Sequence, residues 1–238
     1  MKLDILVFAA HPDDAELSCG GTIATYVKRG KSVGVIDLTR GEMGTRGTQE
    51  IRDEESKNAS QILQLSVRDN LSLRDSFFEK DEVSLIKVIE KIRQYRPDIV
   101  LANAIKDRHP DHARAAEVLQ RAFFISGLKK VNTTLNNEAQ EPWRPRVMYH
   151  YIQSEFIKPD FVADVSEGWE MKMEAVKAYK SQFYDPNSDE PETYISSPEF
   201  MKMIEARGKE LGHSIGVRYG EGFTINRYLG VSDVFALK

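Results

Sequence analysis

The chain has 238 residues, of which 41% are hydrophobic, and this is enough to bury one large core, so we expect one α/β domain over residues 1–238. Its 33 basic and 37 acidic residues give a formal net charge of -4, and because the basic residues are scattered, nucleic-acid binding is disfavoured. The short apolar run before His11 is too brief for a signal-peptide core or a membrane span, so we expect a cytoplasmic protein that does not bind membranes.

The first half of the chain alternates apolar runs with amphipathic stretches. Short apolar runs bounded by turn residues predict strands at residues 3–10, 33–38, 69–73 and 99–102. Apolar residues at helical spacing predict helices at residues 15–29, 49–63, 81–95 and 111–128. This regular alternation predicts a Rossmann-like, doubly wound α/β fold, in which helices cover both faces of a mostly parallel sheet.

The second half of the chain is less regular. Residues 132–141 are polar and are predicted to form a surface loop. Strands are predicted at residues 147–152 and 161–165, followed by a helix at residues 166–179 that Ser166 caps. Three prolines in residues 185–198 predict a long extended loop, of the kind that serves as a lid or as an arm between subunits.

Two histidine-rich segments stand at the ends of predicted strands. His11-Pro12-Asp13-Asp14 follows the first strand, and His109-Pro110-Asp111-His112 follows the fourth. In a doubly wound sheet with the strand order 3-2-1-4, these two strands are neighbours where the winding reverses, which is where such sheets hold ligands. The sequence therefore predicts that both segments open into one crevice.

These side chains match a catalytic site for a divalent metal ion. Catalytic zinc takes three protein ligands, mostly histidines with a carboxylate, and His11, Asp14 and His112 supply such a set. The same donors also accept Fe²⁺, cobalt or manganese. Because consecutive side chains point in different directions, we assign Asp13 as the general base that removes a proton from water.

The remaining residues of the second segment complete the predicted site. His109 would stabilise a developing oxyanion or protonate a leaving amine, with Asp111 orienting its ring or that of its neighbour. Each segment alone could be helix-capping chemistry, because aspartate is a capping residue and proline is common in a first helical turn. The presence of both segments after two neighbouring strands favours a metal site instead.

Other residues are weaker candidates. Cys19 is the single cysteine, which excludes an intramolecular disulfide, and its place in the first predicted helix favours a buried thiol over a nucleophile. His150 and His213 lack partners at ligand spacing. No Gly-x-Gly-x-x-Gly motif follows the first strand, so dinucleotide binding is disfavoured.

The segment 10–16, Ala-His-Pro-Asp-Asp-Ala-Glu, together with His109-Pro110-Asp111-His112, resembles the signature of the LmbE-like (PIG-L) N-deacetylases. These are zinc enzymes that remove acetyl groups from N-acetylglucosamine conjugates. The resemblance covers nearly the whole chain and extends through residues 38–47, 52–55, 179–183 and 216–223. Within the family, the chain is most similar to the bacillithiol-biosynthesis deacetylases, whose substrate is N-acetylglucosaminyl malate.

The resemblance implies the zinc ligands and the general base assigned above, and it adds two substrate contacts. Arg52 would contact an anion or a sugar, because a guanidinium suits the malate carboxylates, and Tyr194 would reach over the site and donate to the acetyl oxygen. The alternatives are an exposed helix residue paired with Glu55 or Ser56 for Arg52, and a surface loop aromatic for Tyr194. Family relatives assemble into hexamers or trimers, which implies a homo-oligomer.

Other functions stay open at this point. The nearest is a related activity with the same chemistry, an amidase of thiol conjugates or a chitooligosaccharide deacetylase. A noncatalytic sugar- or metal-binding protein is a different class, and Asp13 argues against it because a pure binder needs no second carboxylate beside the ligands. Nucleotide binding on a Rossmann-like sheet would require ribose or phosphate contacts and no metal.

Overall fold

The computed structural model describes residues 1–236. One sheet contains the strands β1 Ile5–Ala9, β2 Val33–Asp37, β3 Val67–Asn70, β4 Ile99–Ala102, β7 Val147–Tyr151, β8 Phe161–Asp164 and β9 Gly220–Thr224. Their order is β3-β2-β1-β4-β7-β9-β8. β1 pairs in parallel with β2 and β4, whereas β9 runs antiparallel to β7 and β8. The predicted order 3-2-1-4 is therefore confirmed.

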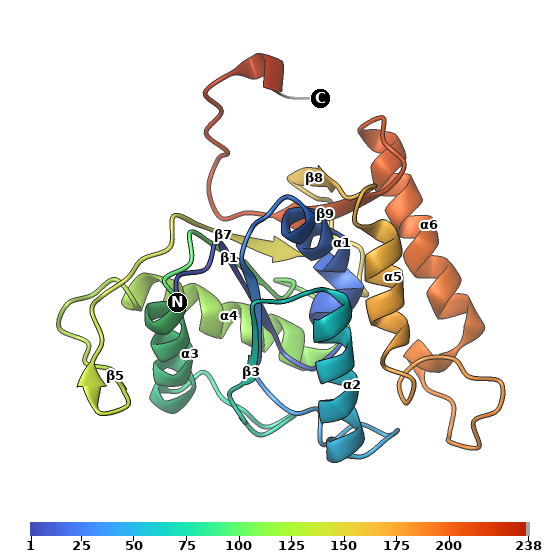
Figure 1. Ribbon diagram of the computed structural model, residues 1–238, viewed down its shortest axis with the longest axis horizontal. Helices are drawn as coiled ribbons and strands as arrows, with labels where there is room; N and C mark the ends of the chain where they lie inside the picture. Colours follow the sequence, from blue (N-terminus) through green and yellow to red (C-terminus); the bar gives the residue numbers. More distant parts are fainter. Residues whose placement is uncertain (237–238) are drawn as a thin grey trace.

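Helices cover both faces of this sheet. They are α1 Asp14–Lys28, α2 Gln49–Ile62, α3 Glu82–Tyr95, α4 Pro110–Ile125, α5 Trp169–Lys177 and α6 Pro198–Ser214. α3 and α4 lie on one face, and α1, α2, α5 and α6 lie on the other (Figure 1). The prediction of a doubly wound, mostly parallel α/β fold is confirmed.

The sheet separates two hydrophobic cores, and β1 contributes to both. Ile5, Val7 and Ala9 pack into the core under α1 and α5, whereas Leu6 and Phe8 pack into the core under α3 and α4. A parallel strand that is buried on both faces requires an uninterrupted apolar run, which is the pattern of this segment. Full burial of each large side chain contributes about 1.5–3 kcal/mol, so this strand is a firm base for the residues that follow it.

The helix α1 is broken near its centre. Cys19 is buried and has non-helical dihedral angles, with φ -135° and ψ 18°, so a new helical turn begins directly after it. The N–H groups of Gly21 and Thr22 in this turn donate to the carboxylate of Glu221 on β9, at 2.9 and 2.7 Å. The strand β9 thus satisfies N–H donors that the break leaves without helical partners.

Several connecting segments differ from the sequence prediction. The third strand begins slightly earlier than predicted, at Val67. The predicted loop 132–141 contains a hairpin, β5 Thr134–Leu135 and β6 Glu138–Ala139, and residues 136 and 137 between them have φ angles of 53° and 67°, which suit a tight hairpin turn. The predicted loop 185–198 is largely irregular and contains the short 3-10 helix η1 Tyr194–Ser196.

The helix predicted at residues 166–179 is α5, but its cap differs from the predicted one. The residue before α5 is Gly168, which makes no side-chain bond to the helix. The Ser166 hydroxyl instead accepts a hydrogen bond from Tyr219 N at 3.1 Å, because the strand β9 begins beside it. The serine therefore joins two elements of the fold rather than ending one.

The sequence prediction contains neither α6 nor β9, and glycines explain this. Gly208 and Gly212 lie in α6, and glycine is a poor helix former. A Cβ atom on Gly208 would lie 2.4 Å from the Trp169 ring, and one on Gly212 would lie 2.7 Å from the backbone of Tyr219. These glycines therefore allow α6 to approach α5 and β9 closely, which local propensity does not reveal.

Two further expectations concern the chain as a whole. No helix among residues 1–236 combines the length and the apolar character that a membrane crossing needs. The single predicted domain spans residues 1–238, and its last two residues, 237–238, lie outside the described residues.

Candidate metal centre and catalytic site

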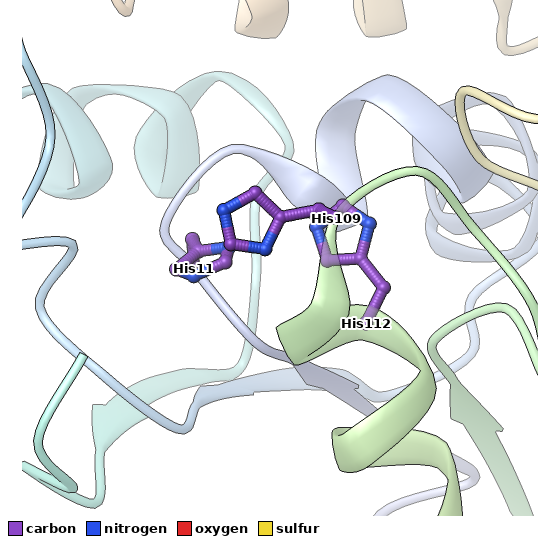
Figure 2. Close-up of side chains that lie close together, drawn as sticks. All are labelled: His11, His109 and His112. Carbon is purple, nitrogen blue, oxygen red and sulfur yellow. The ribbon is translucent and has the colours of Figure 1, made fainter. Parts of the chain in front are cut away.

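The carboxyl ends of β1 and β4 bring the two histidine-rich segments together. The His11 ring centroid lies 4.7 Å from that of His109 and 5.5 Å from that of His112, and the last two rings stack 5.0 Å apart. Figure 2 shows the three rings gathered between the loop after β1 and the start of α4. Both segments therefore open into one site, as the strand order predicts.

The three imidazoles form a cluster of metal-ligating atoms. One ring nitrogen from each of His11, His109 and His112 lies within 4.8 Å of the others. The Asp14 carboxylate joins them, with Oδ1 3.0 Å from His112 Nε2 and Oδ2 3.6 Å from His11 Nδ1. Imidazole and carboxylate donors around one point fit a divalent ion such as Zn²⁺. The structure thus gathers the predicted ligands and places the His109 ring beside them.

Two amide side chains hold Asp14 in place. Asn103 Nδ2 donates to Asp14 Oδ2 at 3.1 Å, and Gln153 Nε2 donates to Oδ1 at 2.9 Å. Burial alone would raise the pKa of Asp14, but His112 and His11 hold this pKa well below its usual range, so the carboxylate is charged. The sequence prediction does not identify Asn103 or Gln153 as site residues. Their position just after β4 and β7, which end at this edge of the sheet, is the signal that could have found them.

Two carboxylates contact ring nitrogens of His112 and His11. Asp107 Oδ2 is 2.5 Å from His112 Nδ1, and Asp75 Oδ1 is 3.1 Å from His11 Nε2. Histidines that bind metals usually donate their other ring nitrogen to such a carboxylate, which fixes the ring orientation. Burial opposes charge on His112, but Asp14 and Asp107 raise its pKa to about 9. Neither Asp107 nor Asp75 is predicted from the sequence, because single carboxylates in loops carry no spacing signal.

The Asp111 carboxylate has a different neighbour from the predicted one. The sequence predicts that it orients His109 or His112, but its Oδ2 lies 3.4 Å from His11 Nε2, and its Oδ1 pairs with Arg114 at 2.5 Å. Since Asp111 lies in the first turn of α4, its backbone N–H donates to His109 Nδ1 at 3.3 Å. Burial lowers the pKa of His109, and this bond assigns the proton of the neutral ring to Nε2.

Asp13 precedes α1 in a strained backbone conformation. Its φ of 112° is left-handed, which aspartate adopts only where the surrounding structure imposes it. Burial raises the pKa of Asp13 to about 7, in spite of the Arg52 guanidinium 3.3 Å from its Oδ2. A carboxyl group with such a pKa takes up a proton near neutral pH. This is the property that the predicted general-base role requires.

Arg52 is buried and ties two loops together. It is 5% exposed and donates to Pro12 O at 2.6 Å and to Gly41 O at 3.2 Å. The alternative of an exposed helix residue paired with Glu55 is therefore wrong. Within residues 1–236, Arg52 Nε is buried without a hydrogen-bond partner, and the residue lines the cavity that contains the site. Contact with a substrate stays a prediction, which this free donor supports.

One cavity of about 360 Å³ is lined by His11, Asp13, Asp14, His109 and His112. Its lining includes Arg108 and Tyr194, and the Arg108 guanidinium lies 4.3 Å from the centroid of the Tyr194 ring. The Tyr194 side chain is 48% exposed and belongs to the same cavity as His109. The predicted hydrogen bond from Tyr194 to an acetyl oxygen stays a prediction. Arg108 is a cation of the lining that the sequence prediction lacks.

Comparisons with known proteins agree with this site. The family model PIG-L, GlcNAc-PI de-N-acetylase, matches residues 6–123, which contain both histidine-rich segments. Diacetylchitobiose deacetylase of Thermococcus kodakarensis is 28% identical, and the match covers 92% of this chain and 81% of the relative. A probable N-acetyl-alpha-D-glucosaminyl L-malate deacetylase 2 of Bacillus subtilis is 29% identical, with 76% of this chain and 84% of the relative covered.

A solved structure extends the likeness to nearly the full length. The conserved protein TT1542 from Thermus thermophilus is 35% identical and has a TM-score of 0.85, with 97% of this chain and 98% of that chain covered. The resemblance indicated by the histidine-rich segments is therefore confirmed by family model, by sequence and by fold. This chain belongs to the PIG-L (LmbE-like) family of de-N-acetylases.

Proposed function

We propose that this protein is a zinc-dependent hydrolase that removes the acetyl group from N-acetylglucosamine conjugates. The observation that carries the proposal is the cluster of His11, Asp14, His109 and His112, beside the buried carboxyl group of Asp13, inside one cavity. The Thermococcus and Bacillus relatives bear names of deacetylases of such sugars, which agrees with this chemistry.

In the proposed reaction, His11, Asp14 and His112 would hold the metal ion. An ion held there would supply a Lewis acid that polarises the amide carbonyl group and lowers the pKa of a water molecule. Asp13 accepts a proton from the attacking water, whose oxygen forms a bond to the carbonyl carbon. His109 donates a hydrogen bond from Nε2 to the carbonyl oxygen as this oxygen gains negative charge. The C–N bond then breaks, and the sugar nitrogen receives a proton from Asp13 or His109.

Zinc is the proposed metal because buried histidines with one carboxylate are its usual catalytic ligands. Fe²⁺ is the alternative that the same donors accept. Elemental analysis of protein purified without added metal distinguishes the two ions. The predicted cytoplasmic location and the predicted homo-oligomer, a hexamer or trimer, remain proposals beside this one.

The finer proposal is that the substrate is N-acetylglucosaminyl malate. Arg52 and Arg108 are two of the cations in the cavity lining, and guanidinium groups pair well with carboxylates such as those of malate. The Bacillus subtilis relative carries the name of such a deacetylase. Chitooligosaccharides are the second candidate, because the Thermococcus diacetylchitobiose deacetylase matches 92% of this chain.

Acetate release tests both levels of the proposal. Protein stripped with a chelator and protein restored with Zn²⁺ are compared on N-acetylglucosaminyl malate, on diacetylchitobiose and on N-acetylglucosamine. Zinc-restored activity that is highest on the malate conjugate supports both the reaction and the substrate. Higher activity on diacetylchitobiose supports the deacetylase reaction but shows that a chitooligosaccharide, and not the malate conjugate, is the preferred substrate. A zinc-loaded protein that binds these sugars without releasing acetate refutes the enzyme and favours a noncatalytic binder.

A further inference from the structure

The cavity that holds the metal centre continues into an apolar chamber between α1, α5, α6 and β9. This chamber is lined by Leu17, Ile152, Trp169, Phe200, Ile204 and Leu211. Figure 1 shows α1, α5 and α6 together on one face of the sheet. The whole cavity, at about 360 Å³, has the volume of roughly a dozen water molecules at roughly 30 Å³ each. An acetyl group, a carbonyl with one methyl, fills a small part of it.

Lys172 and Glu221, two of the charged residues that border the chamber, pair with each other. Lys172 Nζ donates to Glu221 Oε1 at 2.6 Å, and the two residues are 3% and 4% exposed. Glu221 also accepts from the N–H groups of Gly21 and Thr22. Because Lys172 and Glu221 pair with each other, neither presents an unpaired charge to a ligand. The chamber therefore favours an apolar occupant.

The other part of the cavity is polar. Arg108 is exposed there beside Tyr194, and Arg52 Nε is a buried donor without a partner in the part of the chain that the structure describes. Sugar hydroxyl groups and carboxylates find hydrogen-bond donors at this polar part. In the apolar chamber they would lose their bonds to water without replacement. The sugar side of a substrate therefore belongs with Arg108 and Tyr194.

The apolar chamber reaches the metal centre at Leu17, which lies one helical turn from Asp14. Asp14 and Leu17 are three residues apart in α1, which places them on one face of the helix, and both line the cavity. Consider an amide substrate with its carbonyl group at the metal centre and its sugar beside Arg108 and Tyr194. The carbon chain of its acyl group then points toward Leu17.

We infer that the apolar chamber receives the hydrocarbon chain of an N-acyl group longer than acetyl, so that the protein hydrolyses butyryl to hexanoyl amides of amino sugars. This inference rests on the proposed hydrolase function and names the acyl group that the same site takes. The bonds that form and break are unchanged: water adds across the C–N bond, and the products are a short fatty acid and the free amino sugar.

A series of acyl chains tests the inference on the unmodified protein. Zinc-restored protein is supplied with the N-acetyl, N-butyryl and N-hexanoyl forms of glucosaminyl malate and of glucosamine, and release of the primary amine is measured. Each buried methylene is expected to raise kcat/KM by roughly fourfold until the chamber is filled. We expect kcat/KM for the hexanoyl amide to exceed that for the acetyl amide by at least tenfold.

A substitution in the chamber lining tests whether the gain in kcat/KM with acyl-chain length arises in the chamber. Ile204 is buried in the chamber lining, and Ile204→Trp places a larger ring there. This variant is expected to lower the hexanoyl-to-acetyl ratio of kcat/KM by at least tenfold. Lys202→Trp is the matched control, because its side chain lies on the same helix and is 77% exposed, and this variant should keep the wild-type ratio.

Three results would overturn the inference. If the protein releases acetate but its hexanoyl-to-acetyl ratio of kcat/KM is one or less, the proposed deacetylase function is supported and the proposed binding of longer acyl chains in the chamber is refuted. A rate gain from an octyl aglycone on N-acetylglucosamine, abolished by Ile204→Trp, places the aglycone in the chamber instead. Absence of hydrolysis for every acyl length, in protein shown to contain zinc, refutes the proposed function and this inference together.

Discussion

Replacing Asp107 by asparagine tests whether the carboxylates behind the histidines control metal binding. In the structure, Asp107 Oδ2 lies 2.5 Å from His112 Nδ1, on the ring edge away from Asp14. Asp107→Asn keeps the size of the side chain but removes the negative charge of this acceptor. Loss of such a partner typically weakens metal affinity tenfold to a hundredfold. This corresponds to about 1.4–2.8 kcal/mol, the range expected for one hydrogen bond to a charged group.

The pH dependence of this loss gives a sharper test. Asp14 and Asp107 raise the pKa of His112 to about 9 in the metal-free protein, so zinc must displace a proton from this ring at pH 7. Removing Asp107 lowers that pKa, which makes the proton easier to displace and offsets part of the lost affinity. The difference in zinc Kd between wild type and Asp107→Asn should therefore widen as the pH rises from 7 toward 9.

Competition with a chelator of known affinity measures these constants. Asp98→Asn is a matched control, because Asp98 is half-exposed in an ion pair with Lys2 and lies outside the site. The control should bind zinc like the wild type at every pH. A Kd for Asp107→Asn within twofold of the wild-type value at pH 9 would show that the carboxylate does not act on the metal through His112.

Four further outcomes are expected. Asp13→Asn should keep zinc but lose at least a hundredfold in kcat, and a near-wild-type rate would mean that another group is the base. His112→Ala should lose both zinc and activity, and zinc retained in full would remove His112 from the ligand set. Arg52→Met removes the hydrogen bonds to Pro12 O and Gly41 O and the cation beside Asp13, and should lower the free energy of unfolding in urea by about 1–3 kcal/mol at pH 6, where Asp13 is protonated, with a larger loss at pH 8, where the wild-type carboxylate is charged beside Arg52. Wild-type zinc affinity should fall at least tenfold per pH unit from 8 to 6 as protons compete for His112, and an affinity independent of pH would contradict the raised pKa.

The clusters of the site could be predicted because they lie beside the most regular part of the fold. His11 and His112 follow strands with clear apolar patterns, and the doubly wound strand order then fixes where those strands end. Asp75 and Asp107 could not be predicted, because each is a single carboxylate in a loop and only the folded chain brings it beside His11 or His112. Gln153 follows β7, which ends at the same edge of the sheet, so its position carried a signal.

The second half of the fold was harder to predict for a different reason. Gly208 and Gly212 in α6, like Gly220 and Gly222 in β9, are unfavourable for the elements that contain them when judged locally. Their role depends on partners distant in sequence, such as Trp169, which leaves no space for a Cβ atom on Gly208. Tertiary packing therefore decides these elements, whereas local preference decides the strands and helices of the first half.

The break in α1 has a consequence for how the site is assembled during synthesis. The helical turn after Cys19 depends on Glu221 for partners of its N–H groups, and Glu221 lies on β9, the strand of the sheet that is synthesised last. The same helix begins with Asp14, one of the proposed metal ligands. The N–H groups of Gly21 and Thr22 thus gain these partners only once residues 220–224 have been synthesised and folded against α1.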